Sequence, residues 1–110
     1  MDNAGFAKTP EPPYYVVTFT SQRRAGDDGY QLMAERMFAL ALAQPGCLGV
    51  ESARGEDGFG ITCAYFIDEA AILAWKQHTT HLNAQLLGKT RWYEHYAVRV
   101  ARVERAYDGP

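Results

Sequence analysis

The residues best suited to chemistry lie in one short run, Trp75-Lys76-Gln77-His78-Thr79-Thr80-His81. Helical spacing places His78 and His81 on one flank and Trp75 at the edge of an apolar stripe. An imidazole works as a base near neutral pH, forms hydrogen bonds to phenols and carboxylates, and binds metals. No nearby Asp, Glu or Cys completes a set of three or four ligands, so we expect no metal. The alternative is a pair of histidines at a helix boundary and a Trp in the core.

Aromatic side chains form a second group of candidates. The chain has seven Tyr, five Phe and two Trp, which suit either a pocket for a flat hydrophobic ligand or a packed core. In Arg91-Trp92-Tyr93, Arg91 either binds an anion or begins a strand in solvent. There is no glycine-rich phosphate loop, Gly-x-Ser-x-Gly, Cys-x-x-Cys or His-Glu-x-x-His. These absences argue against kinases, zinc proteases and most hydrolases.

Length and composition limit the remaining classes of function. A chain of 110 residues makes one domain, and its formal charge of −2, from 11 basic and 13 acidic residues, provides no basic stripe for nucleic acid. The first residues do not follow the pattern of a signal peptide, and no apolar run approaches the ~18 residues of a membrane span. We therefore predict a cytoplasmic protein without membrane contact. Cys47 and Cys63 match no metal or redox spacing and are expected to be reduced core residues.

Helix and loop signals organise the chain around the candidate residues. The proline-rich residues 1–13 predict a flexible arm. Asp27-Asp28 and Asp68-Glu69 each precede a stripe of apolar residues at helical spacing. The sequence therefore predicts two helices, the first ending at Pro45-Gly46 and the second near Gly88.

Strand signals occupy most of the remaining sequence. Residues 14–20 are β-branched and aromatic, and residues 47–54 and 59–67 alternate about a Gly-rich turn, which predicts a first strand and a hairpin. Residues 92–107 predict a long final strand. Its apolar residues change parity near Ala101, so we expect a bulge or bend there.

The order strand, helix, strand, strand, helix, strand predicts an α+β, ferredoxin-like βαββαβ domain over residues 14–107, followed by a tail at 108–110. In that fold two helices cover one face of a four-stranded antiparallel sheet and leave the other face bare. A final strand of about 14 residues would run ~45 Å, longer than so small a domain can pair by itself. A second copy of the chain would solve both problems, so we expect a homodimer.

Four segments of the chain resemble the antibiotic biosynthesis monooxygenase domain family, and the resemblance covers roughly residues 14–107. They are Phe19-Thr20-Ser21-Gln22-Arg23, Gln44-Pro45-Gly46-Cys47-Leu48-Gly49-Val50-Glu51-Ser52, Tyr65 through Ala74-Trp75-Lys76, and Arg91-Trp92-Tyr93. The Pro-Gly-x-Leu-Gly-x-Glu stretch and the helix Trp are the best markers. The resemblance implies a dimeric α+β barrel in which two ferredoxin-like sheets pack face to face.

The resemblance also implies a chemistry. Similar proteins include small enzymes that oxidise phenolic polyketide anthrones to quinones with O₂ and without metal or flavin. A deprotonated phenol can pass an electron to O₂, so the protein need only hold the aromatic, stabilise the phenolate and exclude water. The implied catalytic residues are Trp75, which lines the pocket, and His78 or His81, which serves as hydrogen-bond partner or base. Substrate contacts are expected from Phe19, Tyr65, Arg91 and Tyr93, with no cofactor.

The chain departs from the family pattern at three positions. An Asn important in polyketide-oxidising relatives, one helical turn before the Trp, is Ala71 here. Other relatives bind and degrade haem, and their strand Asn and axial His fall at Phe19 and near Gln85. We therefore rank phenol oxidation above haem degradation. A non-enzymatic, small-ligand-binding or stress-related dimer is the second class of function that fits.

Overall fold

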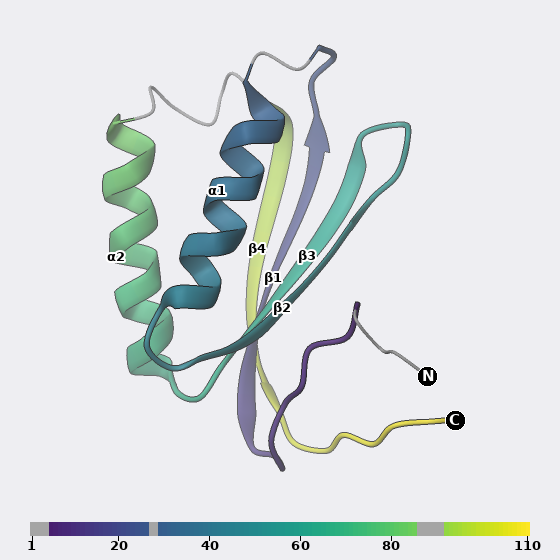
Figure 1. The fold of residues 1–110 in the computed structure, drawn as a ribbon, viewed down its shortest axis with the longest axis vertical. Coiled ribbons are helices and arrows are strands. Elements are labelled where there is room, and N and C mark those ends of the chain that lie inside the picture. Colours follow the sequence, from purple (N-terminus) through teal and green to yellow (C-terminus); the bar gives the residue numbers. More distant parts are fainter. Residues whose placement is uncertain (1–4, 27–28, 86–91) are drawn as a thin grey trace.

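The computed structural model describes residues 5–26, 29–85 and 92–110, and of residues 81–85 the backbone alone. Its elements follow in the order β1 (Tyr14–Arg23), α1 (Tyr30–Ala43), β2 (Cys47–Arg54), β3 (Phe59–Phe66), α2 (Glu69–Gln85) and β4 (Tyr93–Val103). The strands form one antiparallel sheet in the order β2-β3-β1-β4, and both helices lie on the same side of it (Figure 1). This arrangement confirms the predicted α+β, ferredoxin-like fold.

The helices lie where the sequence predicts them, but the expected acidic start of the first, Asp27-Asp28, lies outside the described residues. The first, α1, follows Gly29, whose φ of 82° suits glycine, and it ends before the predicted Pro45-Gly46. The second, α2, follows Asp68, whose Oδ1 accepts a 2.9 Å hydrogen bond from the backbone N–H of Ala71. The predicted end of this helix near Gly88 lies outside the described residues.

Contacts with α1 identify which face of the sheet is covered. The ring of Tyr30, the first residue of α1, lies 5.8 Å from that of Tyr93, which lies 5.4 Å from Phe19. Because side chains alternate along a strand, Phe19 and the positions in phase with it point toward the helices. This helix side includes Val17, Phe19, Ser21, Ala64, Phe66, Tyr96, Val98 and Val100. The opposite, free side includes Tyr14, Val16, Thr18, Thr20, Glu51, Ile61, Cys63 and Tyr65.

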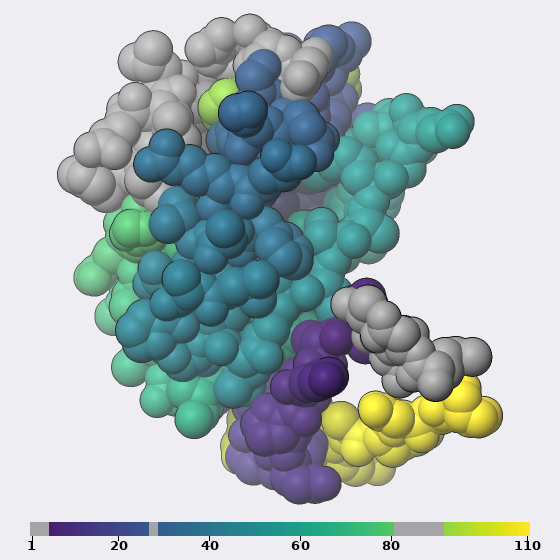
Figure 2. Space-filling model, viewed as in Figure 1, coloured from purple at the N-terminus to yellow at the C-terminus, as the bar shows by residue number. Residues whose placement is uncertain are grey.

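The buried core is small. Fully or nearly buried side chains are Tyr14, Ser21, Ala41, Ala64, Phe66 and Trp92. Both cysteines are free and half-buried, and burial raises the pKa of each thiol. Figure 2 shows α1 covering the front of the molecule, with the turn between β2 and β3 projecting beyond it. In the described part of the chain, no helix combines the length and apolarity needed to cross a membrane.

The N-terminal arm contacts the free side of the sheet. The backbone N–H of Ala7 donates a 3.0 Å hydrogen bond to Glu51 Oε2, and the Thr9 hydroxyl donates one of 3.0 Å to the hydroxyl of Tyr14. A Cβ built on Gly49 would come within 2.7 Å of the Cβ of Ala7, so glycine permits this close approach. Residues 5–13 therefore cover one end of the free side.

Two expectations for the final strand are wrong. The strand β4 has 11 residues and ends at Val103, and the register shift lies between Gln22 and Arg23 rather than near Ala101. The reason for the end is that Val103 pairs with Tyr14, the first residue of β1, and at its other end β1 continues through polar residues to Arg23 and pairs with the start of β4. Strand length thus gives no reason for a partner chain, although the free side of the sheet still does.

Candidate functional site

Two of the expected catalytic residues, Trp75 and His78, lie on the inward side of α2. Between residues 71 and 80 the half-buried positions are 71, 72, 75, 78 and 79, and the others are exposed. This is the period of a helix with one face against the protein. The rings of Trp75 and His78 have their centroids 5.7 Å apart and their planes inclined by 34°. The helix therefore presents an indole and an imidazole together on its covered face.

The imidazole of His78 has a buried nitrogen without a hydrogen bond. Its Nε2 is shielded from solvent and has no partner among the residues that the structure describes. Leaving a polar atom in that condition costs about 1–3 kcal/mol. The neighbouring hydroxyls of Thr79 and Thr80 both donate to the carbonyl of Lys76 at 2.9 Å. The Nε2 atom is therefore available to a ligand that enters the protein interior.

On the sheet, the structure brings together two of the expected substrate-binding residues, Phe19 and Tyr93. Their rings lie 5.4 Å apart at 72°, and Phe19 also stacks on Tyr96 at 5.3 Å and 28°. Both arrangements are favourable aromatic geometries. This aromatic cluster lies on the same side of the sheet as α2.

Beyond the aromatic cluster, the helix side of β4 is incompletely covered. Tyr96, Val98 and Val100 are 42%, 52% and 52% exposed although they point to the same side as the helices. Apolar side chains in such a position favour burial against another apolar group. This edge of the sheet can therefore accept a hydrophobic ligand next to the aromatic cluster.

The phenol of Tyr93 is a proton donor at neutral pH. Its hydroxyl donates to that of Tyr30 at 3.4 Å. Burial, and then the interaction with Tyr30, raises the pKa of Tyr93, while the charges of Arg54 and Arg23 oppose the shift. Because the phenol keeps its proton, it can donate a hydrogen bond to a developing oxyanion but cannot act as a base.

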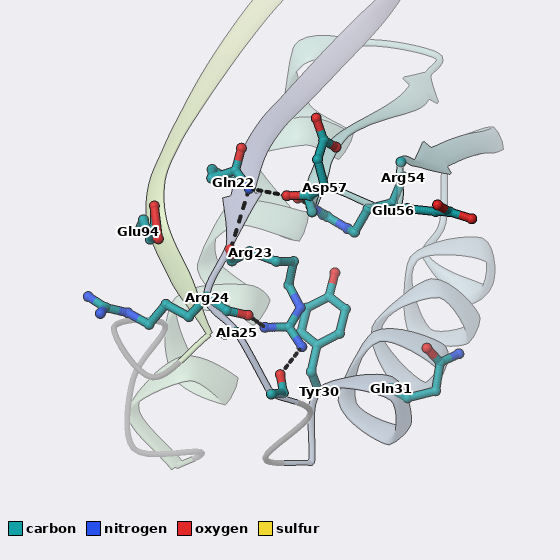
Figure 3. A pocket seen from close by; sticks show the side chains of 13 residues that line it. Gln22, Arg23, Arg24, Ala25, Tyr30, Gln31, Arg54, Glu56, Asp57 and Glu94 are labelled. Atoms are coloured by element: carbon teal, nitrogen blue, oxygen red, sulfur yellow. Dashed lines mark hydrogen bonds between the residues drawn. The ribbon is translucent and has the colours of Figure 1, made fainter.

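Sequence analysis missed a pair of arginines at the end of this cluster. The guanidinium carbon of Arg23 lies 3.7 Å from the centroid of the Tyr30 ring, and that of Arg54 lies 5.6 Å from it (Figure 3). Arg54 also donates a 2.7 Å hydrogen bond to the hydroxyl of Ser21. No local motif joins these residues, because they meet only through the pairing of β1, β3 and β2.

The third described substrate-binding candidate, Tyr65, lies apart from Phe19 and Tyr93. It is on the free side of the sheet, where its hydroxyl donates a 2.5 Å hydrogen bond to Glu51 Oε1 and its ring lies 6.0 Å from that of Tyr14. Burial and then this carboxylate raise the pKa of Tyr65. The structure therefore gives Tyr65 a place under the N-terminal arm rather than in the aromatic cluster.

The side chains of two other candidates lie outside the part of the chain that the structure describes. His81 belongs to α2, but its side chain lies outside the described atoms, as does that of Gln85. Arg91 lies outside the described residues altogether. The roles of His81 and Arg91 stay predictions.

The described strand residues do not match the site pattern of the haem-degrading relatives. Phe19, at the position of the strand Asn in haem-degrading relatives, carries no amide and packs on Tyr93 and Tyr96. Nor does any group of three or more His, Cys, Asp or Glu with the arrangement of a metal site occur within the described part of the chain. We therefore derive no step through haem or a metal.

The fold and these contacts define a small ferredoxin-like α+β protein with an aromatic cluster on the helix side of its sheet. No model of a known protein family matches the chain. It is 54% identical over 99 residues to the uncharacterized protein YqjZ of Bacillus subtilis (strain 168), a match that covers 90% of this chain and 87% of that protein. The chain therefore belongs to the same family as YqjZ.

Solved structures share the fold at low sequence identity. PA3566 from Pseudomonas aeruginosa aligns with a TM-score of 0.66 and 16% identity, over 90% of this chain and 100% of that one. SO0527 from Shewanella oneidensis aligns with a TM-score of 0.67 and 17% identity, over 86% of this chain and 94% of that one. These similarities support the architecture and carry no assignment of activity.

Proposed function

We propose that the protein is a cofactor-independent monooxygenase that oxidises a small, electron-rich aromatic molecule with O₂. The observation that carries the proposal is the buried Nε2 of His78, which lacks a partner among the described residues and lies beside the indole of Trp75. A substrate hydroxyl would satisfy this nitrogen, and the indole would lie along a flat aromatic ring. The resemblance to the antibiotic biosynthesis monooxygenases, in which the helix Trp is a marker, points to the same residues.

The proposed reaction converts a CH₂ group between two aromatic rings into a carbonyl. His78 Nε2 accepts a proton from the substrate, and the resulting anion passes one electron to O₂. The substrate radical and superoxide then combine through a new C–O bond. The peroxide breaks its O–O bond and releases water, so one oxygen atom stays in the carbonyl and the other leaves with two substrate hydrogens. The substrate supplies every electron, so no external reductant is required.

The aromatic cluster supplies the opposite wall and a proton donor in this proposal. Phe19 and Tyr96 provide apolar surface, and the protonated phenol of Tyr93 would stabilise negative charge on the substrate oxygen. Apolar surface on both sides of the substrate would exclude water and strengthen that interaction. His81 and Arg91 are retained as further candidates for contact with the substrate.

We also propose that two chains pair through the free side of the sheet to form a dimeric α+β barrel. Phe59 and Ile61 lie on this side and are 48% and 45% exposed. The described part of the arm contacts this side near Glu51 and Tyr14. Burying apolar surface gives about 25 cal/mol per Å², which favours association of two such faces.

A cytoplasmic location is part of the same proposal. Cys47 and Cys63 are both free thiols. Thiols persist in the reducing cytoplasm, whereas secreted proteins tend to form disulfides.

The decisive experiment measures oxidation of anthrone substrates, which carry the required CH₂ group, by the purified protein. We expect quinone formation with uptake of one O₂ per new carbonyl, and one ¹⁸O atom in the product when the gas is ¹⁸O₂. His78→Ala should lower kcat/KM by about 10²-fold or more, the range of general base catalysis, and Trp75→Phe, which keeps a smaller aromatic wall, should lower it less. The matched control, Gln77→Ala, changes an exposed residue of the same helix and should retain activity.

The same experiment distinguishes the alternative functions. Absence of turnover above buffer across a panel of such phenols would refute the monooxygenase. Saturable binding of a phenol without turnover would instead support a small-ligand-binding dimer. His81→Ala, measured in parallel, reports which histidine the reaction requires.

A further inference from the structure

A second candidate site lies at one end of the sheet. A pocket of about 790 Å³ opens between the end of β1, the turn joining β2 to β3, and the first residues of α1 (Figure 3). Its walls come from residues 22–26, 30–31, 54–58 and Glu94. Neither Trp75 nor His78 lines it, but the pocket adjoins the aromatic cluster through Tyr30, whose ring contacts that of Tyr93.

Arg54 is fixed at the wall of this pocket by acceptors from the protein. Its Nη1 donates to the carbonyls of Ser21 at 3.2 Å and Gly58 at 2.5 Å, and its Nη2 donates to the Ser21 hydroxyl at 2.7 Å. A guanidinium carries five N–H donors, so Nε–H and one Nη2–H have no partner among the described residues. The guanidinium is thus held in position with two donors to spare.

Arg23 is fixed in the same way. Its Nη1 donates to the carbonyls of Arg24 at 2.9 Å and Trp92 at 3.0 Å, and its Nη2 donates to that of Gly26 at 2.9 Å. Within the described residues, Nε–H and one Nη2–H again lack an acceptor. The guanidinium also lies against the face of Tyr30, a favourable cation–π contact.

Both guanidinium groups line this pocket, and within the described residues neither has a carboxylate partner. Both guanidinium carbons are within 6 Å of the Tyr30 ring centroid, at 3.7 and 5.6 Å. The acceptors that hold them are carbonyls and a hydroxyl, which carry no net charge. In the part of the chain that the structure describes, no carboxylate lies within ion-pair distance of either arginine. Two guanidinium charges that line one pocket repel, so an anion in contact with both would be favourable.

Two acidic residues of the turn between β2 and β3 lie at the rim of the pocket. Figure 3 shows the carboxylates of Glu56 and Asp57 directed away from the guanidinium of Arg23. Asp57 Oδ1 accepts a 3.1 Å hydrogen bond from the backbone N–H of Phe59, which holds it in the turn.

We propose that this pocket binds a small oxyanion, the phosphate or carboxylate group of an organic molecule, between Arg23 and Arg54. An oxyanion presents several acceptor oxygens to the spare N–H groups and supplies the missing negative charge. The planar guanidinium suits two-point contact with either group. The proposal is independent of the monooxygenase activity and is tested by binding alone.

The test uses isothermal titration calorimetry of the full chain with inorganic phosphate and with benzoate, at constant ionic strength and with chloride as the control anion. We expect a Kd of about 1 mM or lower for at least one of the two. Phosphate binding alone assigns a phosphorylated ligand, benzoate binding alone a carboxylic acid, and either result supports the site. Failure of both to bind at about 10 mM overturns the proposal.

Variants locate the binding site. Arg23→Gln and Arg54→Gln should each weaken binding about tenfold or more, because each removes charge-assisted hydrogen bonds. Arg36→Gln, on the exposed surface of α1, is the matched control and should bind as the wild type does. Equal weakening in Arg36→Gln would show a general charge effect and overturn the site.

A measurement on the wild type covers the case in which Arg54→Gln fails to fold. In ¹H–¹⁵N spectra recorded during the titration, the largest shifts should fall within residues 22–26, 30–31 and 54–58. Shifts that gather elsewhere would place the anion at another site and refute the assignment.

Discussion

The guanidinium of Arg54 donates a 2.7 Å hydrogen bond to the hydroxyl of Ser21, a side chain that is only 2% exposed. Arg54 ends β2 and Ser21 lies on β1, while β3 runs between the two strands. This one contact therefore spans the sheet and supplies the polar partner that a buried hydroxyl requires.

Ser21→Ala should lower the free energy of unfolding by about 1–3 kcal/mol, because Arg54 Nη2 loses its acceptor in a covered position. Urea denaturation followed by circular dichroism measures the change. The matched control is Ser52→Ala, which removes a hydroxyl 2.7 Å from that of Thr62 at an exposed position. The control should change stability by about 0.5 kcal/mol or less. Equal losses of unfolding free energy in the two variants would show that the Arg54–Ser21 contact stabilises the protein no more than an exposed hydrogen bond does.

Alkaline pH should destabilise the protein through Tyr65. Burial and the Glu51 carboxylate raise the folded-state pKa of Tyr65 above its ordinary value of 10.0. The unfolded chain therefore loses this proton first, so the stabilising contribution is complete below pH 10 and is lost as the pH rises toward the folded pKa. Tyr65→Phe should show a smaller decline in stability above pH 10 than the wild type.

Thermal unfolding between pH 8 and about pH 11.5 tests this slope. Tyr107→Phe is the control, because Tyr107 is 95% exposed and should leave the slope unchanged. Tyr93 has a pKa raised in the same direction, so some decline should persist in Tyr65→Phe. A slope identical to that of the wild type would contradict the role given to the Tyr65–Glu51 contact.

Local patterns in the sequence predict the elements of this fold but not the contacts between them. Helical and alternating periodicity located every strand and helix, and spacing placed His78 on a flank of α2 beside Trp75, whereas the structure shows both on its covered face. The Arg54–Ser21 contact joins residues 33 positions apart, and it depends on the register of three strands. Register is set by the packing of the whole sheet, so neither this contact nor the arginine pair had a local signal.

The extent of β1 shows a second limit of local reasoning. Its last residues are polar and do not alternate in hydrophobicity, yet the strand continues to Arg23. Backbone pairing explains the extension, because the N–H of Arg23 donates to Gly58 O at 2.9 Å and that of Arg24 to Trp92 O at 2.8 Å. Main-chain hydrogen bonds of this kind are available to any residue except proline and leave no trace in side-chain pattern.

Gly46→Ala should destabilise the protein by two separable effects. Gly46 has a φ of 82°, and an added Cβ would lie 2.7 Å from the Cβ of Ala71 and 3.1 Å from Cγ2 of Ile67. Gly29 has the same φ of 82° but nothing within 4 Å of an added Cβ. Gly29→Ala therefore reports the backbone cost alone, about 1 kcal/mol, while Gly46→Ala adds a clash of about 1–3 kcal/mol. Similar losses of unfolding free energy for both variants in urea denaturation would show that α2 shifts to accommodate the added Cβ at no cost.

His78→Leu should separate stability from activity. The substitution replaces a buried nitrogen without a partner among the described residues by an apolar group. Because that nitrogen costs about 1–3 kcal/mol, the variant should be as stable as the wild type or more so, while losing oxidation of phenols. Denaturant unfolding and O₂ uptake are measured on the same preparation. A variant that lost both stability and activity would mark His78 as a structural residue.

Ile61→Glu should dissociate the proposed dimer. Ile61 is 45% exposed in the single chain and lies on the free side of the sheet, where a second copy would bury it. A buried, unpaired carboxylate opposes association, so sedimentation should change from about twice 12.3 kDa to the mass of one chain. Leu32→Glu is the matched control, because Leu32 is 69% exposed on α1, away from that side. A wild type that sediments as one chain at micromolar concentration would refute the barrel, and a dimer that persists in Ile61→Glu would place the interface on another surface.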